Sequence, residues 1–420
     1  MRVSYLKNVL FFVWSKETIK NSVWVSLRYG IVSAIGLLLS VAFARLATKE
    51  VLGQYQVILS IIAFFSIASL PGLNTSALRS VARNESGTVK QAVRLSFISS
   101  ILAIPVLVGY GIYLLQMSGG QSTDVGVACI VLGALLPFLY ASNTWYVFYE
   151  GKLLFRSVSI KIIFSTAVIA LCMYAALWYR LSAFWLALIW FSLNALFSWL
   201  YYWQVSIQED QESDTRGKID IRYGLGLSAQ KFVVNLTDNF PVMAIAFFIG
   251  YEAVATYQVA SGFVVALTGL LAALTAMSLP LIFSQTKEDF KSIFIQNVLM
   301  GLLGSLGYFV VVKLFFILLY GDGFSESYAI AKQLWLLPFF ISIRLFLVNI
   351  FTARQKNKLI VGSYLLVSIS SLFLLFYIVQ RASFTASIAY YLYFINGALI
   401  AIFSLAYYFS KASKKTDSIC

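Results

Sequence analysis

The stretch EVLGQYQV at residues 50–57 returns about two hundred residues later as EAVATYQV at residues 252–259. Glu, Tyr, Gln and Val occupy the same places in both copies. A second match, SLP at residues 69–71 and again at residues 278–280, follows each copy in the same order. Short matches between apolar segments also arise by chance from a reduced alphabet. Two matches in the same order favour an internal duplication with an insertion in the second copy.

The composition around these segments is that of a membrane protein. Of 420 residues, 60% are hydrophobic and 11% are charged, whereas soluble domains carry roughly 25% charged residues. The apolar residues form runs of about twenty, long enough to cross a hydrocarbon layer of roughly 30 Å. The predicted fold class is all-α, a polytopic membrane protein. Its twelve predicted spans are 22–45, 51–73, 95–116, 125–149, 162–179, 184–204, 229–250, 254–283, 292–320, 328–351, 360–380 and 388–409.

The longest polar connection divides these spans into two sets of six. It contains QEDQESDTRGK and lies between the sixth and seventh spans. Because six is even, both halves enter the membrane in the same direction, which is a parallel pseudo-repeat. The apolar face of the first residues predicts an interfacial helix, with a frayed arm as the alternative. The predicted domains are an interfacial helix at 1–21, an N-lobe at 22–204, a linker at 205–228, a C-lobe at 229–409 and a tail at 410–420.

Basic residues set the predicted orientation. With the amino terminus in the cytoplasm, the cytoplasmic segments and Lys231, at the inner edge of the seventh span, hold 23 Lys and Arg residues. The opposite side holds only Lys49, Arg180 and Arg381. This bias predicts that both termini are cytoplasmic. The net charge of +14 is dispersed between apolar runs, which disfavours nucleic-acid binding. The absence of histidine and the scattered positions of three cysteines predict no metal site.

Polar residues inside the predicted spans are the best indication of function, because a charge in hydrocarbon costs about 2.5–3.5 kcal/mol on insertion scales. Asn235, Asp238 and Asn239 share one face of the seventh span. We interpret this face as cavity lining, with Asp238 as the site of a coupling ion, H+ or Na+. The alternative is a carboxylate paired with a cation such as Lys313 or Arg344.

Four cations join the predicted substrate-binding set. Arg344 lies too deep in the tenth span to reach the interface easily, so cavity lining is favoured. Arg28 and Lys313 are open to either cavity lining or snorkelling, and interfacial anchoring is the main alternative for Arg45. With one deep anion against these cations, the cavity is expected to be cationic and to attract an anionic substrate. Guanidinium groups match phosphate oxygens bidentately.

Arg79 and Arg83 follow the second span and are four residues apart. This spacing places both side chains on one face of a lateral helix at the inner membrane surface. We expect them to capture an anionic headgroup there. The alternative is a charge run that only sets topology.

The segments LLLSVAFARLATKEVLGQYQVILS and LPGLNTSALRSVAR, within residues 20–95, resemble the polysaccharide biosynthesis protein family. This family includes Wzx-type O-antigen flippases of the multidrug/oligosaccharidyl-lipid/polysaccharide exporter superfamily. Arg45 and Gly53 match the family pattern, while Arg28, Asp238 and Arg344 correspond only by type and depth. The resemblance implies two lobes around a cationic cavity that opens alternately to each side.

The same resemblance implies a function. An undecaprenyl-diphosphate-linked oligosaccharide, such as an O-antigen unit for lipopolysaccharide, would move from the cytoplasmic to the periplasmic leaflet of a bacterial inner membrane. The expected partners are this glycan lipid, membrane lipids, a polysaccharide polymerase and a chain-length regulator; no cofactor and no nucleic acid are expected.

Two other classes of function were weighed against this one. A drug or metabolite antiporter coupled to ions at Asp238 is one alternative, although a cationic drug would favour a more acidic interior. A membrane enzyme such as a polymerase or glycosyltransferase would need clustered carboxylates and a sizeable outer loop. Neither feature occurs in the sequence, so the protein is predicted not to be an enzyme.

Overall fold

The computed structural model describes residues 16–117, 123–211, 217–265, 287–353, 357–381 and 391–406. The described residues form helices and short connections, with no strand, so the predicted all-α class is confirmed. The first half consists of α2 (Lys16–Leu46), α3 (Lys49–Phe65), η1 (Ser66–Ser69), α4 (Gly72–Val81), α5 (Thr88–Ile101), α6 (Ala103–Met117), α7 (Thr123–Ser142), α8 (Trp145–Gly151), α9 (Phe155–Trp178) and α10 (Ala183–Gln211).

The second half contributes six further helical regions. They are α11 (Ile221–Phe248), the helical residues 251–265, α13 (Lys287–Tyr320), α14 (Ser325–Gln333) continued by α15 (Leu337–Ala353), α16 (Asn357–Arg381) and the helical residues 391–406. The short 3-10 turns η2 (Asp322–Phe324) and η3 (Leu334–Leu336) flank α14. Each predicted span therefore overlaps a helical region among the described residues, and residues 266–283 of the eighth span lie outside them.

Eight of the described helical regions are long and apolar enough to cross a membrane. Two more, Leu359–Ser371 and Tyr391–Ala406, are apolar but shorter. The 28-residue α11 is not among the eight, because Lys231, Asp238 and two asparagines interrupt its apolar sequence. The helix that departs most from a simple membrane span is thus the one with the predicted polar face.

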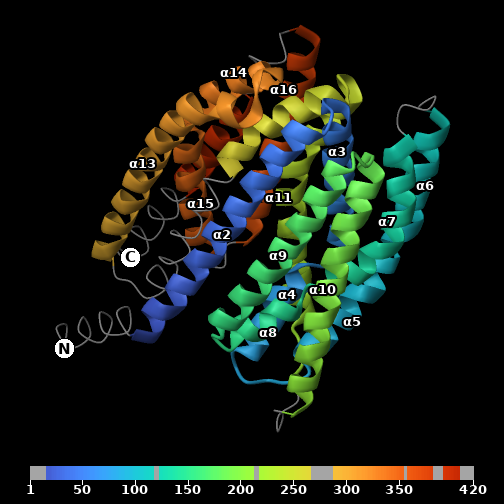
Figure 1. The fold of residues 1–420 in the computed structure, drawn as a ribbon. Coiled ribbons are helices and arrows are strands. Elements are labelled where there is room, and N and C mark those ends of the chain that lie inside the picture. The colour runs from blue at the N-terminus through green and yellow to red at the C-terminus, as the bar shows by residue number, and fades with distance from the viewer. Residues whose placement is uncertain are drawn as a thin grey trace.

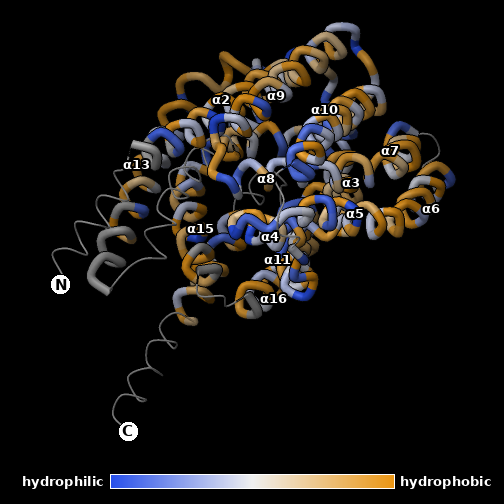
Figure 2. Tube along the Cα trace, turned by 90° about the horizontal axis from the view of Figure 1, so that it is seen from below, coloured by the Kyte–Doolittle hydropathy of each residue, from blue (hydrophilic) through white to orange (hydrophobic). Residues whose placement is uncertain are grey.

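The helices form two groups with α3 and α11 between them (Figure 1). Helices α5, α6, α7, α9 and α10 lie on one side, and α13, α15 and α16 lie on the other. Helix α11 contacts α3 and α4 of the first half as well as α16 of the second. Seen from below, α4 and α8 lie across the middle of the bundle (Figure 2).

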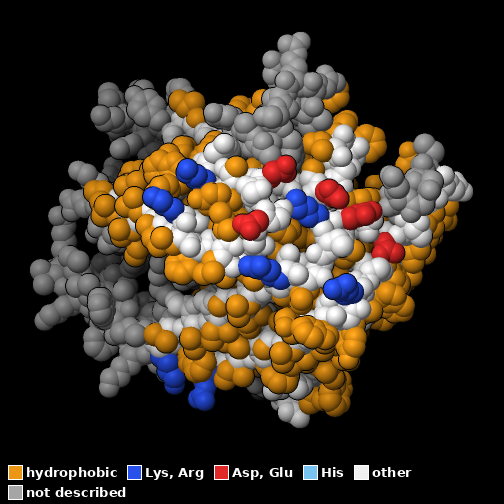
Figure 3. All heavy atoms as spheres, turned by 45° about the horizontal axis from the view of Figure 1, so that its top comes forward, with side chains coloured by type: hydrophobic (Ala, Val, Ile, Leu, Met, Phe, Trp, Pro, Cys, Tyr) orange, Lys and Arg blue, Asp and Glu red, His pale blue; other side chains and the backbone are white. Residues whose placement is uncertain are grey.

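The bundle has two ends, which we name by the elements that they carry. We call the end at which α2 turns into α3 the turn end, and the opposite end, which carries α4 and α8, the α4 end. Charged side chains of both signs gather over the turn end, while hydrophobic side chains cover much of the flanks (Figure 3). Apolar flanks between polar ends are what a bilayer requires.

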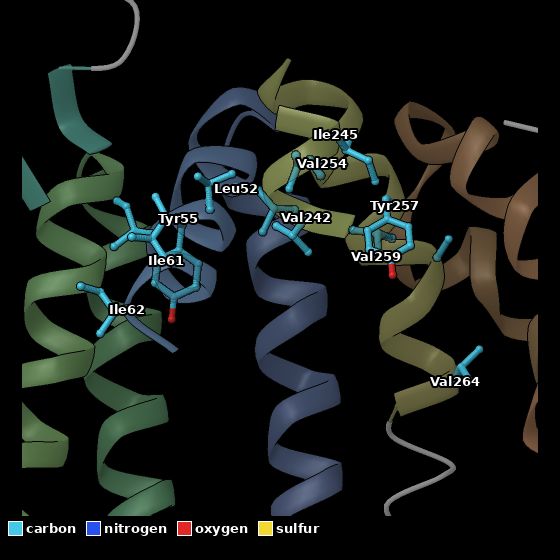
Figure 4. Close-up of a cluster of buried hydrophobic side chains, with 14 of the residues drawn as sticks. Leu52, Tyr55, Ile61, Ile62, Val242, Ile245, Val254, Tyr257, Val259 and Val264 are labelled. Carbon is cyan, nitrogen blue, oxygen red and sulfur yellow. The ribbon is translucent and has the colours of Figure 1, made fainter. Parts of the chain in front are cut away.

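The duplicated segments meet at the turn end, where they contribute to one hydrophobic cluster. Leu52 and Tyr55 of α3 belong to it, as do Val254 and Tyr257 of the second copy and Val242 of α11 (Figure 4). The two matching tyrosines are 3% and 6% exposed, so both copies place this ring in the core. Both copies of the repeat therefore contribute buried residues to one core.

Two contacts show how closely these copies approach. A Cβ on Gly53 would lie 1.9 Å from the Tyr251 carbonyl oxygen, so only glycine allows the observed backbone separation. Gln258 Nε2 donates a hydrogen bond of 3.0 Å to Gln56 Oε1. Because these glutamines hold the same place in the two copies, their pair lies where a pseudo-two-fold axis would pass.

Several predicted boundaries differ from the structure. Helix α10 extends to Gln211 and α11 begins at Ile221, so the connection is shorter than the predicted linker 205–228. Residues 16–21 of the predicted amino-terminal helix continue directly into the first span as part of α2. The rest of that helix, the tail 410–420 and the second SLP segment lie outside the described residues.

Candidate functional site

A cavity of about 520 Å³ lies between the two halves. Helices α3, α7 and α10 line it from one half, and α15 and the helical residues 391–406 line it from the other, together with α11. Its polar lining residues are Gln56, Ser60, Thr237, Asp238, Asn239, Gln258, Ser261, Arg344 and Asn396. Its volume falls within the usual range for a site that binds a small ligand.

The predicted polar face of α11 reaches this cavity in part. Asp238 and Asn239 line it, and Asp238 is exposed there although α3, α4 and α16 surround its helix. Asn235 instead donates a hydrogen bond of 2.7 Å to the Ala63 carbonyl of α3. The Asn239 amide donates to both the carbonyl and the side-chain oxygen of Asn235. Asn235 therefore holds α11 against α3 and orients Asn239.

Arg344 enters the same cavity from α15, as predicted from its depth. Its Nε is buried and has no hydrogen-bond partner within the described part of the chain. Neither Arg344 nor Asp238 forms a salt bridge with another described residue. Among the described residues, Asp238 therefore does not form the ion pair with Lys313 or Arg344 that was the alternative interpretation. Both charges face the cavity.

Aliphatic side chains make up about half of the remaining wall, and amides and aromatic rings make up most of the rest. Gln56, Gln258 and Asn396 carry the amides, and the rings belong to Tyr140, Trp190, Phe191 and Tyr257. Gln56, Gln258 and Tyr257 had a recognisable sequence signal, since all three are matching residues of the repeat, and no signal along the sequence singled out the other three rings. A wall of amides and aromatic faces suits a ligand with many hydroxyl groups, because each hydroxyl both donates and accepts.

Arg28 does not face the cavity as an unpaired cation. Its Nη1 lies 3.0 Å from Glu150 Oε1 of α8, and Arg28 is 9% exposed. The sequence interpretation placed Glu150 just outside its span, but the apolar helical region runs on to Gly151. This buried pair is electrically neutral, so Arg28 is corrected from a cavity cation to one half of an ion pair within the first half.

Arg45 and Lys313 are also absent from the cavity wall. Arg45 Nε and Nη2 donate to the Leu319 and Leu318 carbonyls at the carboxyl end of α13, at 2.8 and 2.6 Å. A cation suits that position because the last carbonyls of a helix carry partial negative charge. Lys313 is exposed on the side of α13 that also exposes Val310 and Leu314. Both residues act outside the cavity.

The expectation of a cationic cavity is consequently revised. Its described lining contains one guanidinium, Arg344, and one carboxylate, Asp238. The expectation included Arg28 and Arg45 among the candidate cavity cations, and packing gives both of them other partners. The wall is polar and mixed in charge.

Arg79 and Arg83 lie at the α4 end and are both exposed. Helix α4 ends at Val81, so only Arg79 belongs to it, and Arg83 lies in the following turn. The predicted shared helical face does not form for this reason. Arg79 lies over the Tyr223 ring, 5.7 Å from its centroid, which joins α4 to the start of α11. Each arginine still presents its charge at the surface.

Solved structures with the same fold are membrane transporters. A MATE protein crystallised in the bent conformation superposes with a TM-score of 0.64 at 13% identity, over 96% of this chain and 97% of that one. A MOP superfamily transporter from Pyrococcus furiosus gives 0.66 at 11% identity, over 94% and 95%. The eukaryotic MATE transporter AtDTX14 gives 0.65 at 11%, over 94% and 96%. At these identities the likeness concerns the fold.

The sequence comparisons identify the family. No curated protein matches the chain. The sequence model of the polysaccharide biosynthesis protein family matches residues 18–286, which is more than half of the 420 residues. The chain therefore belongs to the polysaccharide biosynthesis protein family, with the all-helical fold of the MOP superfamily transporters.

Proposed function

We propose that this protein is a flippase for an undecaprenyl-diphosphate-linked oligosaccharide. The observation that carries the proposal is the cavity shared by two halves, with amides, aromatic rings, Asp238 and Arg344 in its wall. Family membership and the transporter fold support export of a polysaccharide precursor across a membrane. The amides in the wall suit sugar hydroxyls, and the positive charge of Arg344 disfavours a cationic ligand.

The physical task is to move a glycan across hydrocarbon without leaving its polar groups unsatisfied. Each unpaired hydroxyl costs several kcal/mol in a medium that offers no hydrogen bonds. The Gln56, Gln258 and Asn396 amides can replace lost water, and the Trp190 ring offers a flat apolar surface. Hydroxyl groups donate to the Asp238 carboxylate, while Arg344 donates to glycan oxygens. The polyprenyl chain stays in lipid throughout.

Transport further requires the cavity to open alternately to each side. We assign the turn end to the periplasm and the α4 end, with both termini, to the cytoplasm of a bacterial inner membrane, on the basis of the basic residues. Contacts between Gln56 and Gln258 and between Arg45 and α13 join the halves at the turn end. Those contacts must break for release to the periplasm.

Asp238 is the residue we assign to ion coupling. Glycan hydroxyls bind a carboxylate more strongly than a carboxylic acid, because the charged group accepts stronger hydrogen bonds. A proton, or Na+, that occupies Asp238 would therefore weaken glycan binding and favour release. Because the ion and the glycan compete for Asp238, movement of the ion into the cell is coupled to movement of the glycan out of it. A polymerase and a chain-length regulator would act on the released unit, and Arg79 and Arg83 would attract its headgroup beforehand.

Reconstituted vesicles test the proposal. A fluorescent undecaprenyl-diphosphate-linked oligosaccharide is added to one leaflet, and a membrane-impermeant glycosidase reports how much crosses. Asp238→Asn and Arg344→Gln should lower the initial rate about tenfold or more, as expected when a charged hydrogen bond in a closed site is lost. Lys313→Gln is the matched control, since it removes an intramembrane cation from the exposed side of α13.

The same vesicles separate this function from drug or metabolite antiport, which the MATE relatives bring into consideration. Wild-type protein that exchanges a cationic dye for protons while leaving the glycan lipid in its leaflet would overturn the flippase proposal. Full glycan transport by both cavity variants would overturn the assignment of the site. Loss of transport in the Lys313 control as well would contradict the role of the cavity.

A further inference from the structure

A groove of about 590 Å³ lies on the flank of the first half, between α2 and α9. Helix α2 contributes residues between 35 and 46 to its wall, and α9 contributes residues between 167 and 174. Leu38 and Leu171 in this wall are exposed, so the groove opens on the apolar flank that faces lipid. We propose that the groove binds one acyl chain of an anionic phospholipid, with the phosphate of the headgroup at Arg45.

The groove forms because α2 and α9 pack closely toward one end only. Toward the α4 end, Ser159 Oγ of α9 donates a hydrogen bond of 3.1 Å to the Trp24 carbonyl of α2. Toward the turn end the two helices still run side by side (Figure 1), but the small side chains of Ala42, Ala167 and Ala170 line the space between them. Close-packed protein leaves few voids larger than a water molecule. An apolar space of this size in a bilayer is therefore filled by hydrocarbon.

The length of the groove fits a single leaflet. On α2 its wall runs from Ile35 to Leu46, eleven residues later, which is about 16 Å along the helix axis at 1.5 Å per residue. Half of a hydrocarbon layer of roughly 30 Å is about 15 Å thick. The groove therefore accommodates one extended acyl chain of a phospholipid in the leaflet at the turn end.

The polar groups of the described wall lie at the end where a headgroup would be. Arg45 and the Tyr174 hydroxyl are near the last residues of α2 and α9, at the turn end. Arg45 is exposed, forms no salt bridge with another described residue, and donates from Nε and Nη2 to the Leu319 and Leu318 carbonyls. A guanidinium has five N–H donors, so three are left for phosphate oxygens. Its positive charge favours a lipid with a net negative headgroup.

The groove is separate from the site proposed for the glycan. It shares no lining residue with the cavity that contains Asp238 and Arg344. Helix α2 also lies between the groove and the second half, since the Ser40 and Tyr320 hydroxyls are hydrogen-bonded at 3.0 Å. An undecaprenyl chain is, in addition, much longer than the groove. Phospholipid binding here goes beyond the flippase function and does not depend on it.

Photocrosslinking of the full chain in nanodiscs tests the site. The probes are phosphatidylglycerol and phosphatidylcholine with the same diazirine-labelled acyl chain, and undecaprenyl diphosphate with a diazirine in its chain. Mass spectrometry of peptides measures the crosslinks on α2 and α9. At equal lipid fractions, phosphatidylglycerol should label the groove about fivefold more than phosphatidylcholine. Arg45→Gln should make the two phospholipids nearly equal, because the charge is lost while the acyl chain still fits.

Substitutions that fill the groove should displace the acyl chain. Ala170→Phe adds a ring from α9 and should lower crosslinking of the groove by phosphatidylglycerol about fivefold or more. Leu38→Trp does the same from α2 at an exposed position, so the test stands even if Ala170→Phe fails to fold. Ala175→Phe is the matched control, since Ala175 is exposed on α9 but does not line the groove.

Several results would overturn the proposal. One is equal labelling of the groove by phosphatidylglycerol and phosphatidylcholine in the wild type, and another is wild-type labelling in both groove-filling variants. Crosslinks spread evenly over the exposed flanks would show bulk lipid only. Preferential labelling by undecaprenyl diphosphate would assign the groove to the chain of the transported lipid instead. A preference for phosphatidylglycerol that persists in Arg45→Gln would contradict the headgroup position.

Discussion

The two halves of the molecule touch at both ends, but they do so by different means. At the turn end the contacts are exposed or half-buried: Gln56 bonds with Gln258, and Arg45 bonds with the last carbonyls of α13. At the α4 end the contacts are buried or half-buried: Gly72 N donates to Ser228 Oγ, and Ser76 Oγ donates to the Asp220 carbonyl, each at 2.9 Å.

This difference bears on which end can open. A few exposed or half-buried side-chain hydrogen bonds exchange readily for water. The α4 end instead holds the first turns of α11 on α4, and the short connection before α11 is bound as well, since Gly217 N donates to the Ser86 carbonyl. We expect the turn end to act as the gate and the α4 end to act as the permanent joint.

Each end also has a glycine that allows close backbone approach. A Cβ on Gly53 would lie 1.9 Å from the Tyr251 carbonyl oxygen, and one on Gly72 would lie 2.1 Å from the Gly224 carbonyl oxygen. An added Cβ meets a backbone oxygen at both sites. Comparing Gly53→Ala with Gly72→Ala therefore shows whether the turn end can separate and the α4 end cannot.

Gly72→Ala should have the largest effect. The added Cβ meets backbone on a helix that the protein cannot release, and we expect the yield of folded protein to fall about tenfold or more. Size-exclusion profiles of the detergent-solubilised protein measure this yield. Gly36→Ala is the control, because nothing lies within 4 Å of a Cβ there. A normal yield for Gly72→Ala would contradict a fixed joint.

Linking the gate should stop transport without loss of folded protein. Gln56→Cys and Gln258→Cys are combined in a background that lacks Cys129, Cys172 and Cys420, and a cleavable bis-methanethiosulfonate reagent joins them. Flipping should fall to background and return after reduction, because the turn end can no longer part. Each single cysteine variant treated with the same reagent is the control. Full flipping activity in the linked protein would show that the turn end need not separate during transport.

Gly53→Ala should shift the gate toward its open state. The new Cβ disfavours the closed contact with Tyr251, and a change of about 1.4 kcal/mol between two states alters their ratio about tenfold. The rate at which an impermeant maleimide labels Gln258→Cys reports this ratio in vesicles. If Gly53→Ala lowered the yield of folded protein as much as Gly72→Ala, the proposed difference between an opening turn end and a fixed α4 end would be wrong.

Arg45→Gln should produce the smallest change. The arginine is exposed and interacts with the carboxyl end of α13, a kind of interaction that contributes about 0.3–1 kcal/mol. Maleimide labelling at the gate should rise about two- to fivefold, and Arg45→Lys should retain part of the effect. An unchanged labelling rate would assign gate closure to the glutamines and Gly53 alone.

The cavity residues show where sequence reasoning succeeds. Asp238, Asn239 and Arg344 were predicted from polarity and depth alone, and all three line the cavity. Depth is informative because a polar side chain far from both interfaces would be costly in hydrocarbon and therefore faces the interior of the bundle. Asn235 obeys the same periodicity but contacts Ala63, since one helical face is wide enough to serve both packing and lining.

The failures have a common cause. Arg28 and Arg45 were counted as cavity cations, and tertiary contacts pair them with Glu150 and with helix carbonyls. Lys231 was counted with the cytoplasmic charges because it lies at the edge of the predicted span 229–250, whereas α11 begins at Ile221 and places it ten residues into the helix. The partners of a cation lie on other helices, and no pattern along one helix identifies them.

The sequence by itself determined the all-helical membrane fold, the two sets of six spans and the duplication that begins with EVLGQYQV. These follow from local rules, namely the length of apolar runs and the repetition of short segments. Only the tertiary structure decided that Gln56 meets Gln258, that the cavity is mixed in charge and that Arg28 pairs with Glu150. Those facts depend on how helices far apart in the chain are rotated and packed against each other.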